Sequence, residues 1–339
     1  MSPRLSRKVG KMSKPVRVAI NGFGRIGRTV LRAWSQGHWP GIEIVAINDI
    51  ASPEDCAYLF EYDSVFGPLH QEVTLTQGHL TFGPHSLRLT REGDLSRLDL
   101  SDIDVVMECT GKADTPEIAE RGLRAGAKRV LISGPSAAAE FTVVLGANDA
   151  ELTSHMKLVS NASCTTNALA PLVKALDSAF GVETGWMTTI HCYTGSQPTV
   201  DAPRGNPARS RAAALSMVPT TTSAGKLLDR VLPHLAGRVS CAAVRVPVAS
   251  VSAIDLTFQP SRPTTVTQVQ EALRGFGGVI GHTDKPLVSS DLRARPESVI
   301  MATPETQITG GGLVRVFGWY DNEWGFSCRM LDVAQLWHA

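Results

Sequence analysis

A glycine-rich turn near the start of the chain constrains the fold more than any other feature. The residues Asn21–Gly27 read NGFGRIG and contain the pattern G-x-G-x-x-G directly after a β-branched run, Val16–Asn21. Gly22 permits the tight turn, Gly24 lets the backbone approach a pyrophosphate, and Gly27 lets a helix pack closely against a strand. Because the pattern follows a predicted strand and opens a predicted helix, it indicates a dinucleotide whose phosphates lie at the helix N-terminus.

The residue that follows the second predicted strand, Ile42–Asn48, is an aspartate, Asp49. An acid about 20 residues beyond the glycine turn accepts hydrogen bonds from the ribose hydroxyls of a dinucleotide and repels a 2′-phosphate, so Asp49 favours NAD over NADP. The alternative is a purely structural glycine turn with a helix-capping aspartate. The strand, the glycines, the helix and the acid all occur here together, which argues against that alternative. Later residues expected at the same edge of the sheet are Thr110, Gly111 and Ser133.

Short β-branched runs alternate with helical stretches through the first half of the chain. The further predicted strands are Asp104–Glu108, Arg129–Ile132 and Lys157–Val159, and the predicted helices are Arg25–Trp34 and Pro116–Ala125. Strands and helices in this order form βαβ units with right-handed crossovers. The first half is therefore predicted to be an α/β, Rossmann-type, doubly wound parallel sheet.

The pattern changes after Cys164. An amphipathic helix is predicted over Asn167–Phe180, and longer alternating runs follow at Gly185–His191, Ala242–Val248, Val251–Gln259 and Leu313–Tyr320. Long strands with this spacing favour an α+β catalytic domain with a mostly antiparallel sheet. The expected divisions are a basic tail at 1–14, an NAD-binding domain at 15–163 and a catalytic domain at 164–322. A C-terminal helix within 323–339 is expected to pack back on the first domain.

The six cysteines are scattered and none forms a C-x-x-C pair, so we expect no metal site and a reducing, cytoplasmic compartment. Cys164 differs from the others because it lies at the N-terminus of the long predicted helix, where the partial positive charge favours a thiolate. A buried cysteine in a capping segment would look similar, so reactivity also requires a base. His191 is the best candidate, because it ends a strand beside a turn and is expected to be exposed at a rim.

The balance of charges argues against two classes of partner. There are 33 Lys+Arg and 32 Asp+Glu residues, which gives no field to steer nucleic acid or an acidic membrane. The longest apolar runs are shorter than a membrane span. The basic residues through Arg17 lack an apolar core, so they do not form a secretory signal. A disordered tail, a start at Met12 or a transit peptide remains open for this segment.

From Val16 onward the chain resembles the glyceraldehyde-3-phosphate dehydrogenase family. The segments that carry the resemblance are NGFGRIGR (Asn21–Arg28), SNASCTTN (Ser160–Asn167), TTIHCYTG (Thr188–Gly195), RAAALSMVPTTT (Arg211–Thr222), RVPV (Arg245–Val248) and WYDNEWGF (Trp319–Phe326). The cysteine segment is highly specific for this family. The resemblance implies the phosphorylating oxidation of glyceraldehyde 3-phosphate to 1,3-bisphosphoglycerate with NAD, in a cytoplasmic homotetramer.

The resemblance also implies a role for each matching residue. Cys164 would attack the aldehyde to form a thiohemiacetal, and His191 would take the thiol proton before hydride transfer leaves a thioester for phosphate. The implied anion-binding residues are Thr194 and Arg245 for the substrate phosphate, and Ser163, Thr165, Arg209, Thr222 and Ser223 for the attacking phosphate. The implied cofactor residues, besides those above, are Asn21, Arg25 and Ile26, with Asn322 on the nicotinamide carboxamide. The loop Ser196–Arg211 would lie at subunit contacts.

Several residues depart from the family pattern. Ser196 replaces the usual aspartate, Ser223 replaces a glycine, Cys192 replaces alanine or serine, and Ala168 replaces a second cysteine. The altered residues gather near the expected phosphate sites, so an erythrose-4-phosphate dehydrogenase or another sugar-phosphate paralogue is an alternative. A non-catalytic binding module is a further alternative, against which the intact Cys164, His191 and Asn322 argue.

Overall fold

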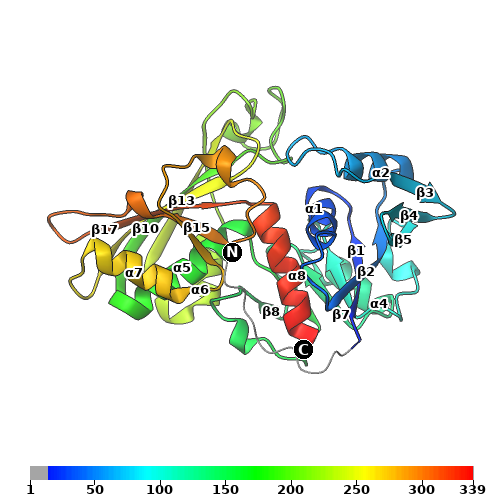
Figure 1. Ribbon diagram of the computed structural model, residues 1–339, viewed down its shortest axis with the longest axis horizontal. Coiled ribbons are helices and arrows are strands. Elements are labelled where there is room, and N and C mark those ends of the chain that lie inside the picture. Colours follow the sequence, from blue (N-terminus) through cyan, green and yellow to red (C-terminus); the bar gives the residue numbers. More distant parts are fainter. Residues whose placement is uncertain (1–13, 339) are drawn as a thin grey trace. The chain divides into compact units, whose positions relative to one another are not determined.

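The computed structural model describes residues 14–338, which form two compact units (Figure 1). The N-terminal unit comprises residues 14–143, 149–162 and 327–338. The C-terminal unit comprises residues 144–148 and 163–326. No helix among the described residues is both long enough and apolar enough to span a membrane.

The N-terminal unit is built on a nine-stranded sheet with the order β3-β4-β5-β2-β1-β6-β7-β9-β8. Its strands are β1 (Val16–Asn21), β2 (Ile42–Asn48), β3 (Val73–Thr76), β4 (His79–Phe82), β5 (His85–Thr90), β6 (Val105–Glu108), β7 (Arg129–Ile132), β8 (Phe141–Thr142) and β9 (Leu158–Ser160). From β5 to β8 every neighbouring pair is parallel, as the sequence predicted. The strand order reverses at β1, between β2 and β6, which is where doubly wound sheets bind ligands.

Two differences from the predicted N-terminal unit are local. The strands β3 and β4 add an antiparallel extension to one edge, which the sequence analysis did not predict. The single helix expected over Pro116–Ala125 is wrong, because two short helices occupy it: α3 (Pro116–Ala119) and α4 (Arg121–Arg124). The helical geometry is interrupted between them at Glu120, whose ψ angle of −1° differs from the regular α-helical value.

The helices of the N-terminal unit include α1 (Arg25–Trp34), which has the predicted bounds, and α2 (Pro53–Glu61). The last helix, α8 (Trp324–His338), belongs to this unit from Ser327 onward. Within the unit, Trp39 donates its indole N–H to Asp332, and the guanidinium of Arg129 donates to the carbonyl oxygen of Trp337. Helix α8 is therefore tied to the first half of the chain.

The C-terminal unit contains an eight-stranded sheet with the order β11-β12-β10-β13-β17-β15-β14, in which β16 also pairs with β17. Its strands are β10 (Val182–Cys192), β11 (Val218–Thr220), β12 (Val239–Val246), β13 (Ser252–Pro260), β14 (Ile280–Thr283), β15 (Val299–Ala302), β16 (Gln307–Ile308) and β17 (Val314–Tyr320). The pairs β10–β12 and β14–β15 are parallel and the other pairs are antiparallel. The sheet is therefore mostly antiparallel, as predicted.

Three helices pack in this unit: α5 (Cys164–Phe180), α6 (Ala224–Val231) and α7 (Val266–Phe276). Helix α5 contacts β10, β13 and β15 and buries most of its residues, which explains its apolar composition. Ser163 caps the helix by accepting a hydrogen bond from the backbone N–H of Thr166. Helix α5 therefore begins at Cys164 rather than at Asn167, and the cysteine is its first residue.

Candidate active site

The thiol of Cys164 and the imidazole of His191 lie together in the C-terminal unit. The Sγ atom is 3.6 Å from Nε2, within hydrogen-bonding reach for sulfur. Helix α5 supplies the cysteine and the end of β10 supplies the histidine. The expectation that His191 is exposed is wrong: it is only 5% exposed, and Tyr320 of β17 packs edge-on at 6.0 Å between ring centroids. A nucleophile and a candidate base are thus held in a largely buried setting.

Burial controls the protonation of this pair. It raises the pKa of the Cys164 thiol, although the positive charge of Arg245 and hydrogen bonds at the start of α5 oppose the effect. Burial, with Arg245 as the second cause, lowers the pKa of His191 to about 4. The hydrogen bonds at the start of α5 thus act in the direction that the sequence analysis expected, and burial acts against them. Burial therefore favours the neutral form of the imidazole, and a neutral imidazole beside the thiol is the form that can accept its proton.

A hydroxyl network joins the start of α5 to the sheet. The phenol oxygen of Tyr320 lies 2.9 Å from Oγ1 of Thr165 and 2.8 Å from Oγ1 of Thr189. Thr189 also donates to the carbonyl oxygen of Ala253 on β13. All three side chains are buried, so the network fixes the first turn of α5 relative to β10. The sequence analysis missed Tyr320 and Thr189, although both lie inside the segments that carry the family resemblance.

The side chain of Asn322 has a fixed orientation. Its Oδ1 accepts a hydrogen bond from the buried thiol of Cys192 at 3.1 Å, and Ser252 lies 3.5 Å away. Burial raises the pKa of Cys192 to about 12, so this thiol remains a donor at neutral pH. The amide Nδ2 is therefore directed away from these partners. Cys192 was noted only as a departure from the family pattern, and its place next to His191 was the available signal.

The residues expected to bind anions make separate contacts within the C-terminal unit. Arg245 contacts His191, whereas Thr194 shares a hydrogen bond of 3.0 Å with the hydroxyl of Ser196. Arg209 donates to the hydroxyl oxygens of Thr220 and Thr221, directly before the start of α6. Of the remaining members, Ser163 caps α5 through its side chain. Ser223 is the residue before α6 and makes no side-chain cap hydrogen bond, and Thr222 accepts from the backbone N–H of Ala224.

The glycine turn of the N-terminal unit has room for a ligand at one position only. A Cβ atom on Gly22 would lie 2.7 Å from the backbone N of Thr110, and one on Gly27 would lie 2.2 Å from the carbonyl oxygen of Gly22. A Cβ on Gly24 would meet no heavy atom of the described chain within 4 Å. Gly24 also precedes α1, whose first turn has no side-chain cap or acidic residue among the described residues. An unfilled space beside a positive helix end fits a dinucleotide pyrophosphate.

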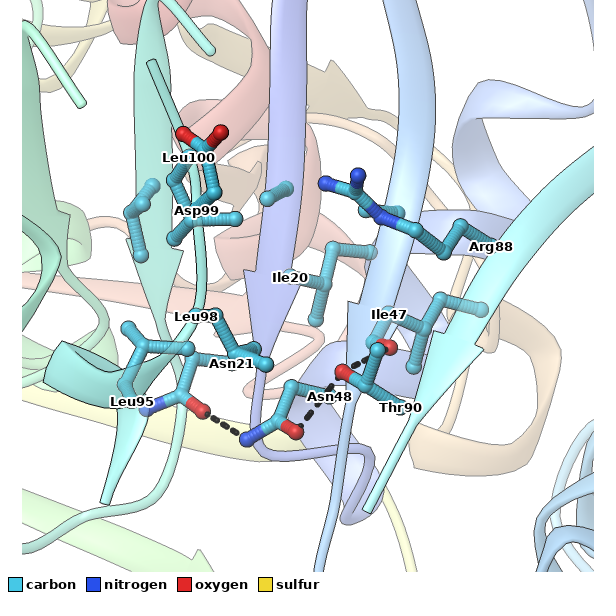
Figure 2. A pocket seen from close by; sticks show the side chains of 13 residues that line it. Ile20, Asn21, Ile47, Asn48, Arg88, Thr90, Leu95, Leu98, Asp99 and Leu100 are labelled. Carbon is cyan, nitrogen blue, oxygen red and sulfur yellow. Dashed lines mark hydrogen bonds between the residues drawn. The ribbon is translucent and has the colours of Figure 1, made fainter. Parts of the chain in front are cut away.

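Two pockets lie along the sheet of the same unit. One, of about 260 Å³, is lined by Gly111 and Ser133 at the carboxyl ends of β6 and β7, together with Glu108. The other, of about 150 Å³, lies along β1, β2 and β5 (Figure 2). Figure 2 shows Asn48 bridging Asn21 and Thr90 at one end of the second pocket.

Two residues expected at the cofactor have their polar atoms engaged by the protein. The amide of Asn21 donates to Glu108 and accepts from Asn48, so it links three neighbouring strands. The carboxylate of Asp49 accepts from the backbone N–H of Phe23 at 2.5 Å and from that of Ala51 at 2.8 Å. Asp49 thereby braces the glycine turn, and its negative charge stays at the end of β2.

The N-terminal unit has a Rossmann-type sheet with an open glycine turn, and the C-terminal unit has a cysteine at a helix start beside a histidine at a strand end. These features together define an NAD-dependent aldehyde oxidoreductase. The family profiles that match are "Glyceraldehyde 3-phosphate dehydrogenase, NAD binding domain" over residues 16–116 and the C-terminal domain of the same enzyme over residues 163–322. The chain belongs to the glyceraldehyde-3-phosphate dehydrogenase family.

Curated relatives of this name match the chain over nearly its full length. The enzyme of Cereibacter sphaeroides is 46% identical over 324 residues, which cover 94% of this chain and 97% of the relative. That of Xanthobacter flavus is 46% identical with the same coverage, and that of Borreliella burgdorferi is 40% identical over 94% of this chain and 99% of the relative. The protein is accordingly an NAD-dependent, phosphorylating oxidoreductase of glycolysis.

Proposed function

We propose that Cys164 and His191 carry out the family reaction, the phosphorylating oxidation of glyceraldehyde 3-phosphate. The observation that carries this proposal is the 3.6 Å distance between Sγ and Nε2, at the first residue of a capped helix. A soft thiolate adds readily to an aldehyde carbon, and the neutral imidazole is the base within reach of its proton.

The proposed reaction begins when the thiol proton of Cys164 passes to Nε2 and Sγ forms a bond to the aldehyde carbon. The imidazolium of His191 then stabilises the alkoxide of the thiohemiacetal and protonates it. NAD, when bound, accepts the hydride. His191 takes the hydroxyl proton as the thiohemiacetal is oxidised to a thioester. An oxygen of inorganic phosphate attacks the thioester carbon, the thiolate leaves, and 1,3-bisphosphoglycerate is released.

The cofactor is assigned to residues 15–163, and the reacting groups to residues 164–322. The open space at Gly24 and the pocket that includes Gly111 and Ser133 support the first assignment. The fixed amide of Asn322 supports its role toward the nicotinamide carboxamide, because only Nδ2 remains to donate. The C-terminal segment 323–339 would complete the NAD-binding domain.

The two anion sites are assigned to the residues that the family resemblance implies for each. Arg245 and Thr194 would hold the phosphate of the substrate, with Ser196 beside Thr194. The attacking phosphate would bind at Ser163, Thr165, Arg209, Thr222 and Ser223. Arginine suits both sites because its planar fork donates to two phosphate oxygens.

A homotetramer is proposed for the assembled enzyme. Val200, Leu215 and Met217 are 72%, 84% and 75% exposed, within or directly after the loop Ser196–Arg211. Exposed apolar side chains that are this close in sequence are typical of a protein contact surface. None of the six cysteines, all within residues 14–338, forms a disulfide, which supports a reducing, cytoplasmic location.

The decisive experiment is a steady-state comparison of substrates and cofactors with purified protein. Glyceraldehyde 3-phosphate with NAD and phosphate should give the highest kcat/KM, with lower values for erythrose 4-phosphate and for NADP. Omission of phosphate should stop turnover after one equivalent of NADH per active site, because the thioester accumulates. Cys164→Ser should abolish the reaction and the fast thiol alkylation, whereas Cys241→Ser, a control on β12, should change neither. Faster turnover of erythrose 4-phosphate without phosphate would overturn the proposal.

A further inference from the structure

Strand register explains why the N-terminal unit contains the pocket shown in Figure 2. The floor of this pocket is a row of side chains across β6, β1, β2 and β5, whose paired members are Val106, Ala19, Ala46 and Arg88. The two central members are buried alanines that lie opposite each other. Two methyl groups in the middle of the row leave space that larger side chains would fill, and a cavity of about 150 Å³ lies beside them.

The segment that covers this floor is also apolar. Leu95, Leu98 and Leu100 line the pocket from the chain that follows β5. Leu95 and Leu100 belong to the same buried cluster as the two floor alanines, and Leu98 packs against that cluster. An apolar cavity of about 150 Å³ stays dry and accepts a molecule of the size of benzene. The interior of the pocket therefore suits a ring or a branched aliphatic chain better than it suits ordered water.

The side chains of the floor lie on the face of the sheet opposite helix α1. A Cβ atom on Gly27 of α1 would lie 3.1 Å from Cγ2 of Ile20, so the side chain of Ile20 packs against that helix. Successive side chains of a strand alternate between faces, so Asn21 points to the other face. There the amide of Asn48 donates to the amide oxygen of Asn21, at the end of the pocket next to the glycine turn. The proposed pyrophosphate space beside Gly24, at the start of α1, therefore does not coincide with the pocket.

Two opposite charges, Arg88 and Asp99, line the other end of the pocket (Figure 2). Within residues 14–338 no ion pair joins these two side chains to each other, and the one ion pair of Arg88 is with Asp102 at 3.8 Å. The carboxylate of Asp102 is also bonded to Arg17 at 2.7 Å. Hydrogen bonds from Ser101 lower the pKa of Asp99, and the positive charge of Arg88 acts in the same direction. A cation and an anion that do not pair with each other complement the two charges of a zwitterion.

We propose that this pocket is a binding site for an α-amino acid with an apolar side chain. The ring or branched chain of the ligand enters between the floor alanines and the leucines that cover them. The ligand carboxylate accepts hydrogen bonds from the guanidinium of Arg88, and the ligand ammonium group donates to the carboxylate of Asp99. A ligand with a charged side chain is excluded, because its charge would lie unpaired against leucine. The site is additional to the cofactor and substrate sites proposed above.

Titration of the enzyme with L-phenylalanine in saturating NAD, followed by methyl NMR, tests the proposal. The methyl signals of Leu98, assigned by their loss in Leu98→Met, should shift with a dissociation constant of about 0.1–5 mM, as expected for a ligand this small. Hydrocinnamate, which lacks the ammonium group, and phenylalaninamide, which lacks the carboxylate, should each bind about 3- to 10-fold more weakly. Lysine should bind at least about 10-fold more weakly than phenylalanine.

Variants separate the walls of the pocket from its charged end. Ala46→Val adds two methyl groups to the floor, so it should fill the cavity and weaken phenylalanine binding at least about 10-fold. Arg88→Met should weaken the binding of phenylalanine about 3- to 10-fold and leave that of phenylalaninamide unchanged, because the amide has no carboxylate to lose a partner. Arg97→Met is the matched control, since Arg97 is an exposed arginine of the covering segment that does not line the pocket. It should change neither affinity.

Each outcome bears on the proposal. Saturable binding that shifts the Leu98 signals and is weakened by both pocket variants supports the site. Displacement of phenylalanine by NAD would overturn it, because the ligand would then occupy the dinucleotide site. Absence of a Leu98 shift would also overturn it, and equal binding of hydrocinnamate and phenylalanine would overturn the assignment to an amino acid. Arg88→Met alters a side chain at the open end of the pocket, so the comparison with phenylalaninamide decides the matter even if Ala46→Val fails to fold.

Discussion

Alanine substitutions in the glycine turn should separate cofactor binding from folding. A Cβ on Gly24 meets no atom of the described chain within 4 Å, and its φ of −71° is accessible to any residue. Gly24→Ala should therefore fold, at a cost of at most about 1 kcal/mol for the poorer helix N-cap. The new methyl group occupies the space beside the N-terminus of α1, where the pyrophosphate is proposed to lie. Loss of one or two charge-assisted hydrogen bonds there, at about 1.5–3 kcal/mol each, should weaken NAD binding at least about 10-fold.

Gly27→Ala is the matched control because its added Cβ clashes with the protein's own backbone and not with the ligand. Its Cβ would lie 2.2 Å from the carbonyl oxygen of Gly22, a contact that only a shift of backbone can relieve. This variant should unfold or lose several degrees in Tm before NAD is added. Calorimetric titration with NAD and thermal unfolding of both variants check the prediction. The reasoning fails if Gly24→Ala binds NAD as tightly as wild type, or if it melts as early as Gly27→Ala.

Three further outcomes are expected. His191→Asn should slow the chemical step by about 10²- to 10⁴-fold in rapid-quench experiments, and near wild-type turnover would exclude His191 as the base. The lowered pKa of His191, about 4 against the usual 6.5, means that unfolded protein binds more protons than folded protein between those values. The free energy of unfolding that depends on a neutral His191 should therefore be complete above pH 6.5 and be lost as pH falls toward 4, by at most about 3 kcal/mol. Urea melts at several pH values check this, and the free energy of unfolding of His191→Asn should decline less over the same range. Cys192→Ala should raise the KM for NAD about 3- to 10-fold, because the amide of Asn322 can rotate, and Cys192→Ser should restore it; equal KM values in all three proteins would rule out this positioning role.

Local patterns in the sequence were enough to predict the strands and the helix that surround the glycine turn. The strands Val16–Asn21 and Ile42–Asn48 and the helix Arg25–Trp34 have the predicted bounds. Each has a continuous apolar or amphipathic pattern that ends at a polar or glycine residue. The strands β3 and β4 were missed because they lie at an edge with many exposed residues, so their sequence carries little hydrophobic periodicity.

The surroundings of the catalytic histidine depended on contacts that no local pattern records. Tyr320 covers His191 from a strand 129 positions later in the chain, and the pairing of β10 with β12 aligns Arg245 with it. Strand pairing and register are set by the complete sheet, so neither the burial of His191 nor its lowered pKa could be read from its neighbours in sequence. The start of helix α5 at Cys164 could be predicted from the sequence, because Ser163 is a typical N-cap residue.

The hydrogen bonds of helix α8 have a consequence for the synthesis of the protein on the ribosome. Trp39 and Asp332, which meet within the N-terminal unit, are 293 positions apart. At translation rates of about 5–20 residues per second, the first partner waits about 15 to 60 s for the second. During that interval the surface that α8 covers, including Trp39 and the side chain of Arg129 that meets Trp337, has no partner from the end of the chain. The nascent N-terminal unit therefore lacks these two hydrogen bonds until α8 has been synthesised.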